Sequence, residues 1–395
     1  MRYIRTYEII KNIKFFLVCT FLTYVLWFQY AFYSISGIMS LLGILLLVLE
    51  VLSAKRISYY RPVLFVFGFI LFDILFGLPF ASYGNLTMST IIDIVELVIP
   101  MIGIFSCIDY DYKQFKKLMI VISIIVFALS ISILVKGTAS YTGALVIGDL
   151  NSNVYSAFIL LGVVSTLFLL CSADNKINSV LLIGILVTEC IAQVLAASRR
   201  GLIVFVFMLL TYTHSLLSIK YKKKPGHKIL IILIIFVLFV ILASQSKNLS
   251  SLVVVKRLTG GTTGGDLKRA AYQSVAWKQF LSSPLWGCGL ASVQGEIGVY
   301  SHSLYYELLA CTGIIGLLFL LLPLARKGII FWKKSTLCYP TETKMEDRTL
   351  CWSILGVFLT GIAVVFIYDV DFYIFVAMFS AYQGIISQRK SDYSM

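Results

Sequence analysis

Charged side chains are scarce in this chain of 395 residues: Asp, Glu, Lys and Arg make up 13% of it, whereas 59% is hydrophobic. A soluble globular domain carries about 25% charged residues. Apolar runs recur along the whole length, and each is long enough to cross about 30 Å of hydrocarbon as a helix. The short alternating segments of a transmembrane barrel are absent. The sequence therefore predicts an all-α integral membrane protein.

Other absences narrow the chemistry. The sequence has no C-x-x-C pair and no cluster of His and Cys, so we predict no metal site and no cofactor. It has eight cysteines, but only Cys288 falls in an outward loop of the topology predicted below, so we predict no disulfide framework. No internal repeat or second soluble domain is evident, which favours a single polytopic membrane domain over 1–395.

The excess of basic over acidic residues follows the predicted topology. The net charge of +14 could suggest a nucleic-acid partner, but most Lys and Arg lie at the ends of apolar runs. With the N-terminus inside, 24 of the 33 basic residues lie in inward loops, as the positive-inside rule requires. We therefore predict about 12 transmembrane helices, both termini cytoplasmic and no nucleic-acid partner. The predicted spans are 15–34, 35–53, 62–80, 88–108, 115–135, 152–172, 178–197, 201–219, 229–245, 303–323, 349–367 and 372–387.

One outward loop, 246–301, is much longer than the others. It holds six of the nine basic residues that break the inward pattern. Loops of this length in compact proteins usually bind ligands or catalyse. The stretch DLKRAAYQSVAWKQFLSSP within it predicts a short helix that ends at Pro284. Its apolar stripe would allow the helix to rest on the membrane surface.

Cationic side chains and a histidine recur on the predicted outer side. Arg199 and Arg200 follow the seventh span, Lys268 and Arg269 lie on the loop helix, and His302 opens the tenth span. Guanidinium groups donate paired, charge-assisted hydrogen bonds that suit a pyrophosphate. An imidazole can accept the proton of a sugar hydroxyl. These residue types together predict a site for glycosyl transfer from a lipid-linked pyrophosphate.

Each feature also has an ordinary structural explanation when it is considered alone. An interfacial arginine pair is more often a snorkelling anchor, and a lone interfacial histidine is more often structural. Gly313 and Gly316 more often permit close helix packing than contact a ligand. The order and spacing of the features therefore carry the functional prediction.

That order resembles the O-antigen ligase and O-antigen/capsular polysaccharide polymerase superfamily of bacterial membrane enzymes. In that family an outward Ser-Arg pair follows a span, and a loop Arg precedes a Pro-x-x-Gly-x-Gly turn by about fifteen residues. A His-Asn/Ser pair then opens a helix that carries Gly-x-x-Gly. The matching residues here are Ser198-Arg199, Arg269, Pro284 to Gly289, His302-Ser303 and Gly313 to Gly316, and Asn153 matches an Asn that begins a middle span.

The resemblance covers about 150–390, and it departs from the family pattern at two positions. Gln273 replaces a frequent aromatic residue four positions after the loop arginine, although Tyr272 is adjacent. Ser303 replaces the commoner Asn after the histidine. Sugar contacts near these positions therefore cannot be transferred from the family.

The resemblance implies an inverting, metal-independent glycosyltransferase of the bacterial cytoplasmic membrane whose active site faces outward. Its donor and acceptor would be undecaprenyl-pyrophosphate-linked oligosaccharides, with membrane lipid around it and a chain-length regulator as a possible protein partner. It would act as a repeat-unit polymerase for O-antigen or capsule. The implied catalytic residues are His302, Arg199 and Arg269, and the expected substrate-binding residues are Arg200, Lys268, Tyr272, Asn153 and Glu307.

Two alternatives remain open at this point. An O-antigen ligase, which transfers the glycan to a lipid A core, shares all of these motifs. A transporter or flippase for lipid-linked sugars would explain the intramembrane acids Asp73 and Glu189, because buried carboxylates are costly and usually functional. A transporter would also tend to have two related halves, and none are evident in this sequence.

Overall fold

The computed structural model describes ten stretches of the chain, and helices dominate them. The stretches are 2–32, 37–52, 63–139, 145–147, 152–173, 175–196, 198–221, 264–337, 340–362 and 364–393. The predicted span 229–245 and part of the loop 246–301 lie outside the described residues. Apart from helices, this part of the chain has one antiparallel pair of two-residue strands, β1 (Thr138–Ala139) and β2 (Leu145–Val146).

Eight described helices are long and apolar enough to cross a membrane, which confirms a multi-pass helical protein. These candidate spans are Glu8–Ala31, Gly84–Ile108, Tyr112–Lys136, Ser152–Cys171, Lys176–Leu195, Arg199–Lys220, Leu304–Ser335 and Val370–Gln388. The first comprises most of α1 (Arg2–Thr23) with the π-helical turn Tyr24–Phe28 and α2 (Gln29–Ala31). The others are α5 (Gly84–Ile108), α6 (Tyr112–Lys136), α7 (Ser152–Cys171), α8 (Lys176–Leu195), α9 (Arg199–Ser215) with the π-helical turn Leu216–Lys220, α14 (Leu304–Ser335) and α16 (Val370–Tyr393).

The predicted number of twelve spans is not confirmed. The predicted spans 35–53 and 62–80 correspond to the shorter apolar helices Ser40–Val51 and Leu64–Phe80. The first lies within α3 (Ile38–Leu52), and the second comprises α4 (Leu64–Phe72), a π-helical segment Asp73–Gly77 and a 3-10 turn Leu78–Phe80.

Two predicted boundaries near the C-terminus also need correction. The span predicted at 349–367 is the helix α15 (Thr341–Gly361), which starts earlier because its polar second turn packs inside the protein: Glu346 and Asp347 are buried and accept hydrogen bonds from Tyr382. The span predicted at 303–323 continues to Ser335 in α14. Lys327, which the sequence placed in a loop, is buried there and donates to Gln383 Oε1 at 2.6 Å.

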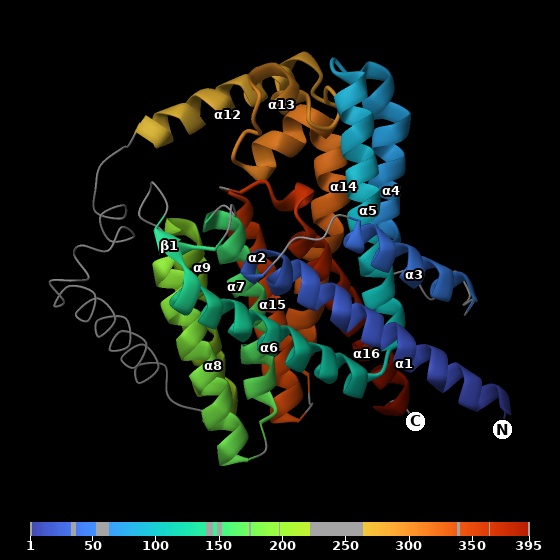
Figure 1. Cartoon of the computed structure of the whole chain (residues 1–395), viewed down its shortest axis with the longest axis vertical. Coiled ribbons are helices and arrows are strands. Elements are labelled where there is room, and N and C mark those ends of the chain that lie inside the picture. Colours follow the sequence, from blue (N-terminus) through green and yellow to red (C-terminus); the bar gives the residue numbers. More distant parts are fainter. Residues whose placement is uncertain are drawn as a thin grey trace, which may run out of the picture.

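The helices α7 and α16 occupy the centre of the molecule, since 89% and 83% of their apolar windows are buried. The helix α8 lies at the edge, with 17% of its window buried, as expected of a surface that faces lipid. Around α7 pack α6, α8, α9 and α15, and α16 packs on α5 (Figure 1).

Two helices of the long loop lie at one end of the molecule. They are α12 (Gly264–Ser282), which matches the predicted loop helix, and α13 (Ser292–Ile297). Both pack on α14. The start of α1 and the end of α16 lie toward the opposite end (Figure 1). This separation is the arrangement that both termini inside and the loop outside would give, although the orientation in a membrane stays a prediction.

Candidate functional site

The first turn of α9 presents the arginine pair. Ser198 is the N-cap residue, and its Oγ accepts from the backbone N–H of Gly201 at 3.3 Å. The same hydroxyl donates to Asn153 Oδ1 at 3.1 Å, which ties the start of α9 to the first turn of α7. Arg199 and Arg200 are the first two helical residues. A helix N-terminus carries partial positive charge and free N–H groups, so their guanidinium groups lie where an anion is already favoured.

A buried hydrogen bond lies directly beneath this turn. Gln193 Nε2 donates to Ser156 Oγ at 2.7 Å, and both residues are buried. The backbone of Gly201 lies against this pair so closely that a β-carbon there would be 1.5 Å from Ser156 Oγ and 2.1 Å from Gln193 Nε2. Only glycine therefore lets α9 approach α7 and α8 at this depth.

The helix α12 contributes a half-buried arginine and tyrosine. Arg269 and Tyr272 are three residues apart, so they share one helix face, whereas Lys268 is exposed on another. The ring of Tyr272 stacks on the imidazole of His302, with centroids 5.8 Å apart and planes 26° apart. The predicted loop helix is thus held against the predicted catalytic histidine.

His302 lies in the short connection before α14. Its backbone φ is +60°, a left-handed conformation that non-glycine residues adopt rarely and that is often found at functional sites. The centroids of the Tyr300 ring and the imidazole lie 4.7 Å apart, and the two ring planes meet at 63°. Two tyrosine rings therefore lie against the half-buried imidazole.

The charges of two arginines act on this imidazole. Burial first, and then the positive charges of Arg269 and Arg200, lower the pKa of His302 to about 4. The same two arginines act on the Tyr300 hydroxyl, whose pKa burial raises. Arg200 and Arg269 are far from His302 in sequence. In the structure both are close enough for their charges to lower the pKa of His302. The catalytic role of Arg199 stays a prediction.

Glu307 points into the protein. It is 1% exposed, and its Oε2 accepts from the Ser301 N–H at 2.7 Å. Its Oε1 accepts from the Tyr368 hydroxyl at 3.3 Å and from Cys311 Sγ at 3.7 Å. The carboxylate of Glu307 therefore bonds to the loop that carries His302, and its expected contact with substrate stays a prediction.

The two glycine motifs interlock and fix the loop on α14. Gly313 has φ +64° and ψ −171°, so α14 breaks there. The turn Pro284 to Gly289 fills the break: Cys288 and Gly289 donate their N–H groups to the carbonyls of Ala310 and Cys311, both at 2.9 Å. Ile314 and Ile315 donate in return to Pro284 and Leu285, at 2.9 and 3.4 Å. The absence of a β-carbon on Gly313 permits this close contact between the turn and α14.

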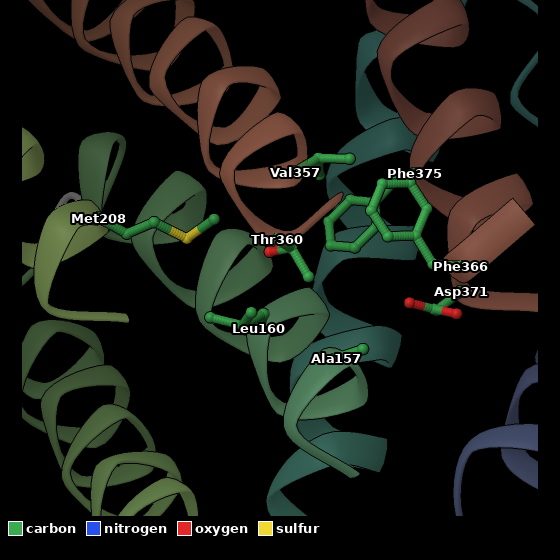
Figure 2. A pocket seen from close by; sticks show the side chains of 8 residues that line it. All are labelled: Ala157, Leu160, Met208, Val357, Thr360, Phe366, Asp371 and Phe375. Carbon is green, nitrogen blue, oxygen red and sulfur yellow. The ribbon is translucent and has the colours of Figure 1, made fainter. Parts of the chain in front are cut away.

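A cavity lies among α7, α9, α15 and α16 (Figure 2). Its empty volume is about 280 Å³, including space open to the surroundings, and its walls are mainly apolar. The carboxylate of Asp371 points into it, and Oδ1 of that carboxylate has no hydrogen-bond partner within the described part of the chain (Figure 2). A buried carboxylate oxygen in this position is expected to hold a water molecule.

The intramembrane acids differ in their surroundings. Glu189 Oε1 accepts from Thr166 Oγ1 at 3.4 Å, and Thr166 shares a hydrogen bond of 2.8 Å with Ser123. Asp73 lies buried in the π-helical segment, and neither of its oxygens has a hydrogen-bond partner among the described residues. Within those residues no group of three or more His, Cys, Asp or Glu could hold a metal ion.

Sequence reasoning missed several residues of this site. Tyr300 and Tyr368 were overlooked because aromatic residues near span ends usually form an interfacial belt. Gln193 was overlooked because an amide within an apolar run has no motif of its own. Asp369 directly precedes the last helix and acts electrostatically on Tyr300. Its position as an acidic residue between two apolar runs could have identified Asp369 from the sequence.

Part of the chain matches a known protein family. Residues 182–321 match a family model described as O-antigen ligase. The match runs from α8 to the middle of α14 and includes both arginines of α9, Arg269 and His302. No curated protein matches the chain.

The chain is a multi-pass membrane protein, and its residues 182–321 resemble the O-antigen ligase family. The resemblance to that superfamily, predicted from the motifs, is confirmed. The family is glycosyltransferase-like, and it implies a lipid-linked polysaccharide as substrate.

Proposed function

We propose that the chain is an oligosaccharide repeat-unit polymerase of a bacterial cytoplasmic membrane, with its active site on the outer face. It transfers a growing glycan from undecaprenyl pyrophosphate to a lipid-linked repeat unit of an O-antigen or capsule. The observation that carries the proposal is that Tyr272 stacks on His302 at 5.8 Å and so holds α12, which bears Arg269, against the imidazole. The positive charges of Arg269 and Arg200 lower the pKa of His302, which agrees with this arrangement. A site with paired cations and one imidazole suits a reaction in which a diphosphate leaves and a hydroxyl loses a proton.

The proposed step is a single displacement. The acceptor hydroxyl oxygen bonds to the anomeric carbon, and the bond from that carbon to the diphosphate oxygen breaks. The electron pair leaves on undecaprenyl pyrophosphate, where Arg269 and the arginines of α9 stabilise the developing charge. The hydroxyl proton passes to the imidazole of His302. Attack opposite to the leaving group inverts the anomeric configuration, and the step needs no metal ion.

The positions of the remaining predicted residues support binding roles. The first turn of α9 adds its N–H groups to the two guanidinium groups, so this helix end is the favoured place for one phosphate. Asn153 holds that turn through Ser198. Tyr272, whose ring stacks on His302, would contact a sugar beside the imidazole, and the exposed Lys268 would attract the anionic donor. A chain-length regulator is the proposed protein partner.

The O-antigen ligase is the second candidate, and the description of the matching family favours it. Ligase and polymerase would share the donor, the arginines and the histidine, and they would differ in acceptor. Purified protein in lipid vesicles, supplied with lipid-linked repeat units and a chelator of divalent cations, separates them. A ladder of products supports the polymerase, and a single transfer to added lipid A core supports the ligase. Movement of the lipid-linked sugar without a new bond would refute both.

A further inference from the structure

The backbone around His302 is closed by hydrogen bonds from its neighbours. Ser301 Oγ donates to the Ser303 carbonyl at 2.9 Å, and Ser303 N–H donates back to Ser301 Oγ at 3.4 Å. These two bonds join Ser301 to Ser303 and close a small ring around His302, whose backbone is in the left-handed conformation. The direction of the imidazole therefore depends on where Ser301 is held.

Glu307 holds Ser301. The hydrogen bond from Ser301 N–H to Glu307 Oε2, at 2.7 Å, is the shortest contact of this carboxylate. Glu307 lies in the first turn of α14, where the helix dipole favours a negative charge. The Tyr368 hydroxyl, which donates to Glu307 Oε1, also accepts from the Ala291 N–H at 3.3 Å. The carboxylate is thereby tied both to the His302 loop and to the start of α13.

We propose that Glu307 is a positioning residue, which sets the backbone of Ser301 and so aims His302 at the acceptor hydroxyl. The inference rests on the proposed function for its consequence in catalysis, but not for the geometry itself. It replaces the expected substrate contact of Glu307, because every contact of the carboxylate is with the protein interior. It also assigns Tyr368 as the second support of the same loop.

The isosteric replacement Glu307→Gln separates positioning from chemistry. Its amide oxygen can still accept from Ser301 N–H, and its amide nitrogen can donate to the Tyr368 oxygen. Glu307→Leu removes both bonds. A residue that binds substrate through its charge, or takes a proton, would be disabled equally by both replacements.

The first measurement reports on the imidazole and does not require turnover. The chain has three histidines, so a His214→Gln/His227→Gln background leaves only His302 for nuclear magnetic resonance. The rings of Tyr272 and Tyr300 should shift its imidazole protons from the positions of free histidine. We expect Glu307→Gln to keep this shift and Glu307→Leu to lose it. Glu296→Leu is the matched control, because Glu296 bonds to Gln279 and not to the His302 loop, and it should keep the shift.

The second measurement is glycan transfer by the same variants. Glu307→Leu should lower kcat about 100-fold, the scale expected for a misplaced catalytic group, with the KM for donor unchanged. Glu307→Gln should stay close to the wild type. If Glu307→Leu does not fold, Tyr368→Phe is decisive and should lower kcat with partial loss of the His302 shift.

Equal loss of the shift in the Gln and Leu variants would overturn the proposal. An unchanged shift in folded Glu307→Leu, or in Tyr368→Phe if the Leu variant does not fold, would overturn it as well. A wild-type protein that transfers no glycan would instead refute the proposed function. In that case the resonance experiment still decides whether Glu307 positions His302.

Discussion

The backbone of Gly313 lies against the carbonyl of Leu285 so closely that a β-carbon on Gly313 would be 2.3 Å from that oxygen. The two residues are 28 positions apart, one in the break of α14 and the other in the turn that fills it. Their contact joins the long loop to the helix that His302 opens. The geometry of the site therefore depends on a backbone contact that a single methyl group would disrupt.

Gly313→Ala should destabilise the protein and separate α12 from α14. The substitution combines a clash with the Leu285 carbonyl and a positive φ, and residues forced into such backbone conformations cost about 1–3 kcal/mol. Thermal unfolding in detergent should show a clear loss, with glycan transfer reduced in parallel. Gly184→Ala is the matched control, because Gly184 is helical and nothing lies within 4 Å of its would-be β-carbon. A Gly313→Ala protein as stable as the control would contradict the interlock.

Arg269→Ala should abolish glycan transfer while the protein stays in the membrane, and Arg269→Lys should also be impaired. A point charge on lysine cannot replace the paired donors of a guanidinium group. With a hydrogen bond to a charged group contributing about 1.5–3 kcal/mol, the lysine variant should lose roughly 10- to 100-fold in kcat/KM. Lys278→Ala, on the exposed side of α12, is the control and should transfer at the wild-type rate. Full activity in Arg269→Lys would exclude a bidentate contact with the diphosphate.

The pH dependence of His302 gives an independent test of the cationic site. Burial, Arg269 and Arg200 hold its pKa at about 4, below the ordinary value of about 6.5. As the pH falls, the imidazole therefore stays neutral, and able to accept a proton, down to a pH of about 4. The acid limb of kcat/KM, which reports the free protein, should lie near that pH.

Removing a positive charge or adding an anion should move this pKa upward. Titration of His302 by nuclear magnetic resonance should give a higher pKa in Arg269→Gln, and also in wild type with inorganic pyrophosphate. Lys278→Gln should titrate like the wild type. An unchanged pKa in Arg269→Gln would mean that this arginine does not share the site of His302.

The sequence predicted the helical membrane class, most long spans and the loop helix, because each has a local signal. Apolar length marks a span, and Pro284 marks the end of α12. The same signals failed where tertiary packing replaced lipid. Glu346 and Asp347 near the start of α15 are buried against Tyr382 of α16, and buried Lys327 is paired with Gln383, so hydropathy placed both boundaries wrongly.

Motif spacing identified the residue types of the site but not their arrangement. It assigned a catalytic role to Arg199 and a binding role to Arg200. The direction of each side chain, however, depends on where the first turn of α9 begins after its cap at Ser198. Charge and motif also assigned Glu307 to substrate, because a sequence does not reveal that Ser301 and Tyr368 converge on its carboxylate. Such contacts arise only when segments tens of residues apart fold together.

Because Gly201 contacts Ser156 and Gln193, we expect substitutions at Gly201 and Ser156 to have non-additive effects on the binding of pyrophosphate. Gly201→Ala places a methyl group on Ser156 Oγ and Gln193 Nε2, so α9 must move away from α7 and carry the arginine pair with it. We expect weaker binding of a pyrophosphate probe, by roughly tenfold if one charge-assisted hydrogen bond is lost.

Ser156→Ala removes the nearest clashing atom, so the double variant Ser156→Ala/Gly201→Ala should lose less binding affinity than the two single variants combined. Calorimetric titration of all four proteins measures this coupling, with Gly184→Ala as the control for a helical glycine. Strict additivity would mean that Ser156 and Gly201 act on the arginine pair independently, contrary to their contact in the structure.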